Sequence, residues 1–321
     1  MTAPVSKWTK IYVCVRSNPL SGCSKCRRRA LVRRRKRQSK SVTTPDQRTI
    51  ERLIDDALEE DLGAGDLTSA ATLGKDTRIE LVMATRQDII VAGLDIALQV
   101  FRRLAPDAHI ECLSEDGARL PKDGQLMLLK GPARALLSGE RTALNIVQML
   151  SGIATETGRF VDAIAGTGAV LLDTRKTIPG LRELSKYATR LGGATNHRMR
   201  LDDGVLIKDN HIAVAGSVTQ ALKLAQQAGL KDIEVECDTL EQVEQALAAG
   251  ADKILLDNMS NDELRQAVEM SGGRIPLEAS GGVNIKTIRA IAETGVDFIS
   301  VGHITQSAGA VDIGLDMIEP L

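Results

Sequence analysis

The stretch KILLDNMSNDELRQAVEMSGGRIPLEAS, residues 253–280, decides the fold class, because it holds two short apolar segments with a helical pattern and a glycine pair between them. The same arrangement recurs along the second half of the chain at a spacing of about 22 residues. The glycines that close successive helical patterns are Gly229, Gly250, Gly272 or Gly273, and Gly295. The sequence therefore contains an internal repeat whose unit is one strand followed by one helix.

Six segments of this region are expected to be strands of one parallel sheet, since each is apolar on both faces, as strands are when helices cover both sides. They are AVLLDT at 169–174, GVLIKD at 204–209, IEVEC at 233–237, KILLD at 253–257, IPLEAS at 275–280 and FISVG at 298–302. Six such units predict a closed or nearly closed α/β barrel. A doubly wound sheet is the alternative, but it more often carries a Gly-rich dinucleotide turn after its first strand, which is lacking here.

The first half is expected to form a separate mixed α/β domain, because 321 residues are enough for about two domains. Order should begin near Pro45, where Asp46 can cap a helix. The apolar positions of that helix fall on one face, at Ile50, Leu53, Ile54 and Leu58. Asp66 is a second possible cap, and residues 78–150 mix short apolar strands with helical patterns.

Charge divides the chain into a basic leader and an acidic body. Residues 1–45 contain thirteen Lys or Arg and no Asp or Glu, which leaves 28 basic against 42 acidic residues in the rest. The acidic body makes nucleic acid unlikely as the main partner. The leader is expected to be disordered. A nucleic-acid-binding arm, a targeting peptide and a translation start placed too far upstream are the alternatives.

The cysteines and the hydropathy indicate a cytoplasmic protein. Only Cys112 and Cys237 lie in the body, which is no disulfide framework for a domain of this size and fits a reducing compartment. Cys23 and Cys26 of the leader have too few partners for a four-ligand zinc site. No apolar run approaches the ~20 residues that cross a bilayer, so no membrane partner is expected.

Polar residues follow the predicted strands, at the edge of the barrel where active sites lie. In chain order these strand ends are Asp173-Thr174-Arg175-Lys176, Lys208-Asp209-Asn210, Glu236, Asp257-Asn258, Ser280-Gly281-Gly282 and Gly302-His303. A single one would be explained by a solvated strand end or a salt bridge. Six in succession predict a pocket for an anionic, phosphorylated ligand with a divalent metal.

Glycine turns follow two of these strands. The turn Ser280-Gly281-Gly282 precedes a helical pattern from about Asn284, so its backbone N–H groups and the helix N-terminus are expected to hold a phosphate. Gly302 is expected to act likewise, with tight packing of a turn as the alternative explanation.

Glu236 and Asp257 lie on neighbouring predicted strands, a separation that suits joint holding of Mg²⁺ together with pyrophosphate oxygens. Salt bridges with Lys208 and Lys176 are the alternative role for the two carboxylates.

The densest polar segments are DTRKTIPGLR at 173–182 and GGATNHRMRLDDGVLIKDNHI at 192–212. Their cationic and imidazole side chains are Arg175, Lys176, His197, Arg198 and Lys208. Arginine supplies a planar fork for carboxylates and lysine a point charge for phosphate. A ligand that bears both groups is therefore predicted.

These two segments resemble quinolinate phosphoribosyltransferase, also called carboxylating nicotinate-nucleotide pyrophosphorylase, and the resemblance runs from about residue 46 to the C-terminus. It implies an N-terminal α/β sandwich domain at 46–143, an incomplete, about six-stranded α/β barrel at 144–302, and a segment, 303–321, that returns to the first domain. The leader, 1–45, has no counterpart in the family. Arg200 departs from the family, which often has a small residue there.

The resemblance implies that quinolinate and 5-phosphoribosyl 1-pyrophosphate, with Mg²⁺, give nicotinate mononucleotide, pyrophosphate and carbon dioxide in NAD biosynthesis. By motif position, the quinolinate carboxylates would be held by Arg175, His197, Arg198 and Lys208. The phosphoribosyl donor would be held by Lys176, Glu236, Asp257, Ser280, Gly281, Gly282 and Gly302, with Thr174 and His303 beside them. Lys176, Glu236 and Asp257 would be the catalytic residues.

Arg141, in SGERTALN at 138–145, matches the family's arginine that enters the neighbouring subunit's site, which implies at least a homodimer. No general base is expected, because the pyridine nitrogen carries no proton to remove, so His197 is an orienter or an anion donor. Two alternatives remain. One is a related phosphoribosyltransferase acting on another acid such as nicotinate, and the other is a nucleic-acid-binding protein that acts through its leader.

Overall fold

The computed structural model describes residues 44–320, so the predicted disordered leader and its Cys-x-x-Cys pair lie almost wholly outside the described residues. The described chain begins with helix α2 (Gln47–Leu62), in which the Asp46 carboxylate accepts a hydrogen bond from the Arg48 N–H. Helix α3 (Leu67–Thr72) follows, and Asp66 accepts from the Ser69 N–H. Both predicted caps are confirmed, as is the buried face of α2, which includes Ile50, Ile54 and Leu58.

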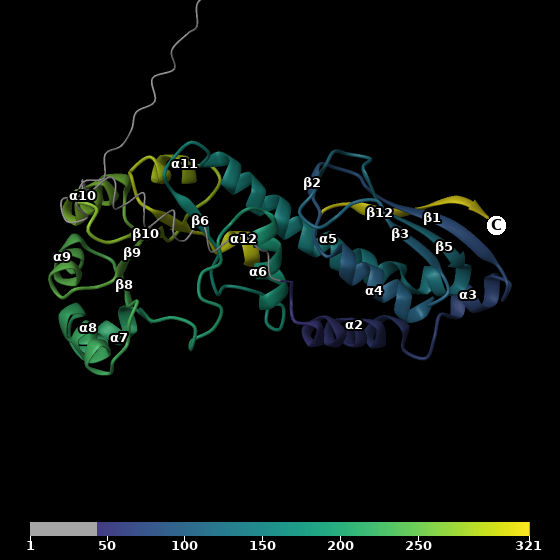
Figure 1. Cartoon of the computed structure of the whole chain (residues 1–321), viewed down its shortest axis with the longest axis horizontal. Helices are drawn as coiled ribbons and strands as arrows, with labels where there is room; N and C mark the ends of the chain where they lie inside the picture. The colour runs from purple at the N-terminus through teal and green to yellow at the C-terminus, as the bar shows by residue number, and fades with distance from the viewer. Residues whose placement is uncertain (1–43, 321) are drawn as a thin grey trace, which may run out of the picture.

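An antiparallel sheet forms the centre of the N-terminal half, with strand order β12-β1-β5-β3. Its strands are β1 (Arg78–Thr85), β3 (His109–Cys112), β5 (Gln125–Pro132) and β12 (Ile313–Pro320). Because β12 comes from the end of the chain and pairs with β1, the C-terminal segment lies in this half of the molecule, as Figure 1 shows. A separate two-stranded ribbon joins β2 (Ile89–Ile90) to β4 (Arg119–Leu120).

Helices α4 (Leu94–Leu104) and α5 (Ala133–Ala163) pack against each other beside the antiparallel sheet and share its apolar core. Helix α5 is 31 residues long and runs from this half into the barrel half, so the predicted domain boundary at 143/144 falls inside a continuous helix (Figure 1). Its small residues permit close packing. A Cβ at Gly152, for example, would collide with the Gly309 carbonyl.

The second half is an incomplete α/β barrel built on a six-stranded sheet of order β6-β11-β10-β9-β8-β7. Its strands are β6 (Val170–Leu172), β7 (Leu206–Ile207), β8 (Glu234–Cys237), β9 (Lys253–Asp257), β10 (Leu277–Ser280) and β11 (Phe298–Ser300). Every strand pair is parallel. Strands β6 and β7 are the two ends of this order, so hydrogen bonding does not close the barrel. All six predicted strands are confirmed, several with shorter ends.

Helices alternate with these strands. They are α6 (Arg182–Leu191), α7 (Asp209–Ala215), α8 (Val218–Gln227), α9 (Leu240–Ala248), α10 (Asn261–Ser271), α11 (Ile288–Ala292) and α12 (His303–Gln306). The helices that precede the repeated glycines end within a few residues of them. Thr239 and Ser260 form capping boxes at the starts of α9 and α10. After α10, Gly272 takes a left-handed conformation with φ of 55°, which favours glycine.

The barrel strands differ from the prediction in one respect. They were expected to be apolar on both faces, yet Glu234, Lys253 and Glu278 are buried on β8, β9 and β10.

No helix within residues 44–320 combines the length and the hydropathy needed to cross a membrane.

Candidate active site

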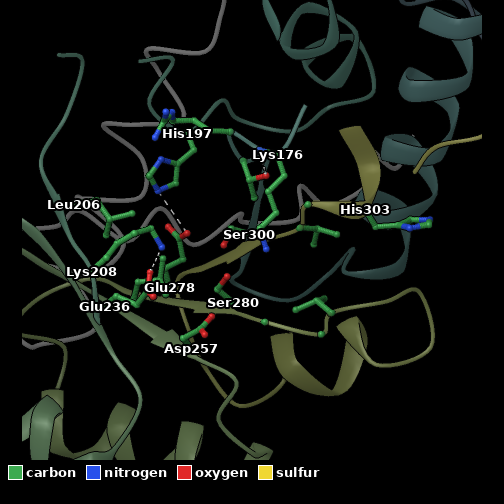
Figure 2. A pocket seen from close by; sticks show the side chains of 18 of the residues that line it. Lys176, His197, Leu206, Lys208, Glu236, Asp257, Glu278, Ser280, Ser300 and His303 are labelled. Carbon is green, nitrogen blue, oxygen red and sulfur yellow. Dashed lines mark hydrogen bonds and ion pairs between the residues drawn. The ribbon is translucent and has the colours of Figure 1, made fainter. Parts of the chain in front are cut away.

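A cavity of about 640 Å³ opens at the carboxyl ends of the barrel strands and gathers thirteen of the fourteen predicted site residues (Figure 2). Thr174, Arg175 and Lys176 follow β6, and Lys208 follows β7. His197 and Arg198 come from the segment between α6 and β7. From the ends of the next four strands come Glu236, Asp257, Ser280, Gly281, Gly282, Gly302 and His303. The strand ends that the sequence singled out therefore meet at one place.

Two arginines of the cavity lack matching anions. The Nε atom of Arg175 is buried with no hydrogen-bond partner. Burial and the neighbouring Arg175 lower the pKa of the Arg198 guanidinium, and Glu234 only partly opposes them. One Arg198 nitrogen donates to the Gly204 carbonyl at 2.9 Å. Two adjacent guanidinium groups with so little compensation favour a ligand that brings carboxylate or phosphate oxygens.

The imidazole of His197 is held by the protein through both ring nitrogens. Its Nδ1 accepts the Arg198 backbone N–H at 2.8 Å, and its Nε2 lies 3.2 Å from Glu234 and 3.6 Å from Glu278. Figure 2 shows the ring directed toward the Glu278 carboxylate. Because neither nitrogen is left for an incoming anion, this arrangement favours orientation over anion donation as the role of His197.

Below the imidazole lies a buried charge network of Glu234, Lys253 and Glu278, which we call the floor of the cavity. The sequence analysis did not predict it. The Lys253 ammonium contacts Glu278 and lies 2.9 Å from Glu234, over the Phe298 ring. Burial raises the pKa of Glu234, but Lys253 and His197 outweigh burial and lower it to about 2. Burial lowers the pKa of Lys253, but the two carboxylates outweigh burial and raise it. The available signal was a charged residue inside each of three predicted strands, ahead of the residue that ends the strand.

His197, Glu234 and Glu278 also place three possible metal-ligand atoms within 4.8 Å of one another. The Lys253 ammonium already supplies a cation between the two carboxylates. The cluster is therefore explained as the support of the imidazole without a metal ion.

The two predicted donor-site carboxylates have different surroundings. Glu236 forms an ion pair with Lys208, so the alternative expectation of a salt bridge is confirmed for this residue. Asp257 instead accepts a hydrogen bond from Asn258 at 2.5 Å. Burial and Asp238 raise the pKa of Asp257, and the two cavity lysines only partly offset them. Both carboxylates face the cavity (Figure 2).

The turn after β10 depends on glycine for its backbone conformation and its close packing. Gly281 and Gly282 have φ of 90° and 59°, and a Cβ on Gly281 would collide with the Asn258 side chain. The prediction that a helix starts at Asn284 is wrong, since α11 begins at Ile288 and has five residues. Asn284 instead forms a side-chain turn, accepting from the Lys286 N–H, and such turns compete with helix.

Gly302 serves the cavity through close approach. Its φ of −73° suits any residue, but a Cβ there would lie 2.9 Å from the Lys176 side chain. The Lys176 backbone is fixed on both sides, since Thr305 donates to its carbonyl at 2.6 Å and its N–H donates to Thr174 at 3.0 Å. Glycine at 302 therefore lets the lysine lie across the end of β11.

Arg141 is the one predicted site residue that does not line this cavity. It is exposed on α5, in the other half of the molecule. Its expected position in a neighbouring subunit's site stays a prediction.

An incomplete α/β barrel that gathers cations, carboxylates and glycine turns at its strand ends defines a class of enzyme that binds anionic, phosphorylated substrates. The family model for the quinolinate phosphoribosyl transferase C-terminal domain matches residues 153–316, and the model for the N-terminal domain matches residues 66–151. Together they cover most of the chain. This protein belongs to the quinolinate phosphoribosyl transferase family.

Individual relatives agree with this assignment. The chain is 43% identical over 270 residues to a probable carboxylating nicotinate-nucleotide pyrophosphorylase of Bacillus subtilis, covering 84% of this chain and 93% of the relative. It is 44% identical to the Mycobacterium leprae enzyme of that name, covering 81% of this chain and 94% of the relative. The solved nicotinate-nucleotide pyrophosphorylase of Francisella tularensis matches with a TM-score of 0.83 and 41% identity. The match covers 87% of this chain and 99% of the solved chain.

Proposed function

We propose that this protein transfers the phosphoribosyl group of 5-phosphoribosyl 1-pyrophosphate to quinolinate and releases pyrophosphate and carbon dioxide, giving nicotinate mononucleotide for NAD biosynthesis. The observation that carries the proposal is the convergence of Arg175, Arg198 and Lys208 with Lys176 and two glycine turns in one cavity. The first set suits a dicarboxylate, and the second suits phosphate groups.

The arginines would orient quinolinate so that its pyridine nitrogen faces C1′ of the ribose. The unpartnered Arg175 Nε and the destabilised charge of Arg198 both favour binding of carboxylates. His197 would keep the loop in place, since its ring nitrogens are already bound to the backbone and to Glu234. No side chain has to remove a proton, because the attacking nitrogen carries none.

Breaking the bond from C1′ to pyrophosphate leaves positive charge on the sugar and negative charge on the leaving group. Lys176 would stabilise the departing pyrophosphate, and Glu236 or Asp257 would face the cationic ribose. Since Lys208 pairs with Glu236 before substrates bind, quinolinate would draw Lys208 away and free that carboxylate for the donor.

Mg²⁺ is the metal expected to accompany the donor. Glu236 and Asp257 suit an ion that keeps waters and phosphate oxygens in its coordination shell, because two carboxylates are too few for a protein cage. When bound, the ion would add positive charge beside the pyrophosphate. We further propose a homodimer in which Arg141 reaches the partner's cavity, and a cytoplasmic location, which the free thiols of Cys112 and Cys237 support.

The test is a turnover assay with quinolinate and the donor in the presence of Mg²⁺. Equal amounts of pyrophosphate and carbon dioxide are expected, with little pyrophosphate from nicotinate. Turnover of nicotinate at a similar rate would favour the related transferase instead. A chain lacking residues 1–45 should keep its turnover. A full chain without turnover, whose nucleic-acid binding vanishes when residues 1–45 are deleted, would favour action through the leader.

A further inference from the structure

A second buried ion pair lies beside the cavity without lining it. Asp173 directly follows β6, Lys186 lies on α6, and both side chains are fully buried and in contact. Burial lowers the pKa of the Lys186 ammonium, although Asp173 opposes this effect. A buried ion pair of this kind is often no more stabilising than apolar residues of the same volume. Its use has to be sought in what the two side chains hold.

What they hold is the peptide of His197. One Asp173 oxygen accepts the His197 N–H at 2.8 Å, and the Lys186 Nζ donates to the His197 carbonyl at 3.0 Å. The N–H and the C=O of a single residue are thus fixed by the two members of one ion pair. These bonds are charge-assisted, and such bonds are stronger and more directional than bonds between neutral groups.

The preceding residue is held by the same pair. The Asn196 side-chain amide donates to the second Asp173 oxygen at 2.5 Å and to the Lys186 carbonyl at 2.9 Å. Thr189 also donates to that Asp173 oxygen, at 2.9 Å. The loop therefore enters the cavity with both its backbone and a side chain tied to the buried pair.

Asp173 also joins the two parts of the site. It directly precedes Thr174, Arg175 and Lys176, whereas the loop that it holds continues into Arg198. One carboxylate thus sets the position of the arginine after β6 relative to the arginine of the next loop. Those two arginines are the groups that would meet a dicarboxylate.

We infer that Asp173 and Lys186 are positioning residues, which hold the His197–Arg198 peptide so that Arg175 and Arg198 present the spacing a dicarboxylate requires. This inference rests on the proposed function for the identity of the ligand. The pair touches no substrate and acts through the loop. Misplacing a binding group by about 1 Å can reduce its effect by about 100-fold.

The test uses the double variant D173N/K186M, which removes both charges without leaving one of them buried alone. Two measurements are made on it. Calorimetric titration with quinolinate should show affinity weakened by about 10- to 100-fold. Hydrogen exchange of the peptide covering residues 195–199 should become faster, a result that needs no ligand.

Two further variants separate positioning from general destabilisation. Leu264→Ala, in the buried face of α10, should lower the melting temperature while leaving quinolinate affinity and loop exchange unchanged. D173N/K186Q, which restores a neutral donor at 186, should recover part of the lost affinity. Asn196→Ala removes only the side-chain tie and should weaken affinity in the same direction, even if the double variant folds poorly.

Wild-type affinity and wild-type loop exchange in a folded D173N/K186M would overturn the inference. The same holds if Leu264→Ala reproduces both effects at an equal loss of melting temperature. Failure of the wild-type protein to bind quinolinate would instead count against the proposed function, and the exchange measurement would still report on the loop.

Discussion

The rim of the cavity carries Arg175, Lys176 and Arg198, and the buried network beneath it is its floor. Both contain charged side chains, yet they differ in how those charges are compensated. In the floor, Lys253 lies between Glu234 and Glu278; all three are buried, and of the three only Glu278 lines the cavity. On the rim, Arg175 has a buried nitrogen without a partner and lies beside Arg198. Floor charges that compensate one another maintain the structure, whereas uncompensated rim charges are available for a ligand.

The largest expected effect is on the floor. Lys253→Met leaves two carboxylates buried without their cation, so the free energy of unfolding should fall by about 3–5 kcal/mol. Chemical denaturation measures this change. Arg265→Met, which removes an exposed ion pair with Asp262, is the control and should cost less than about 1 kcal/mol. Equal effects of the two variants would erase the distinction between floor and surface charges.

On the rim, the effect should appear in binding. Arg198→Ala should weaken quinolinate binding by about 2–5 kcal/mol, because a desolvated ion pair is lost. Unfolding should change little, since the substitution also removes a repulsion from Arg175. Arg200→Ala is the matched control from the same loop, because Arg200 is exposed and paired with Asp202. An unchanged quinolinate affinity of Arg198→Ala in calorimetry would contradict the assignment of the rim.

The floor should also respond to acid. Lys253 and His197 outweigh burial and lower the pKa of Glu234 from 4.5 to about 2, so its ionised form stabilises the folded state above pH ~4.5. That contribution, up to about 3 kcal/mol, is lost as the pH falls from ~4.5 to ~2. Unfolding free energies measured across this range should fall less steeply in Glu234→Gln. The same slope in both proteins would show that Glu234 is not held in this way.

The smallest effect is expected at the donor side of the rim. Gly302→Ala places a methyl group 2.9 Å from the flexible Lys176 side chain, which can shift by a few tenths of an ångström. The KM for the phosphoribosyl donor should rise by about fivefold, equivalent to about 1 kcal/mol. Gly309→Ala is the control, since a Cβ there meets nothing within 4 Å. A larger loss of quinolinate affinity than of donor affinity would show that Lys176 binds quinolinate and not the donor.

The rim could be predicted from sequence because a parallel barrel brings the residues after its strands to one edge. The glycine period located the strands, and the residues that end each strand gave Glu236, Asp257 and the Ser280 turn. The floor was missed because its charges lie far apart in sequence, on β8, β9 and β10. Pairing within the interior depends on strand order and register, which a strand-by-strand reading does not supply.

One local error, the predicted start of α11, has a physical cause as well. Residues 284–287 follow a helical pattern, but the Asn284 side chain bonds to nearby backbone and delays α11 to Ile288. The boundary at 143/144 was placed by resemblance, and no glycine or proline marks it because α5 continues through it. The buried pair Asp173–Lys186 could not be predicted either, since nothing in the amino-acid sequence indicates that the Lys186 side chain faces inward.

The most direct test of the account is to compare the affinities of the wild-type protein for quinolinate and for nicotinate by calorimetry. The two acids differ by one carboxylate, so this comparison reports whether the uncompensated rim cations bind a dicarboxylate. Quinolinate is expected to bind at least about 10-fold more tightly, which corresponds to about 1.4 kcal/mol. Equal affinities, or tighter binding of nicotinate, would contradict the account.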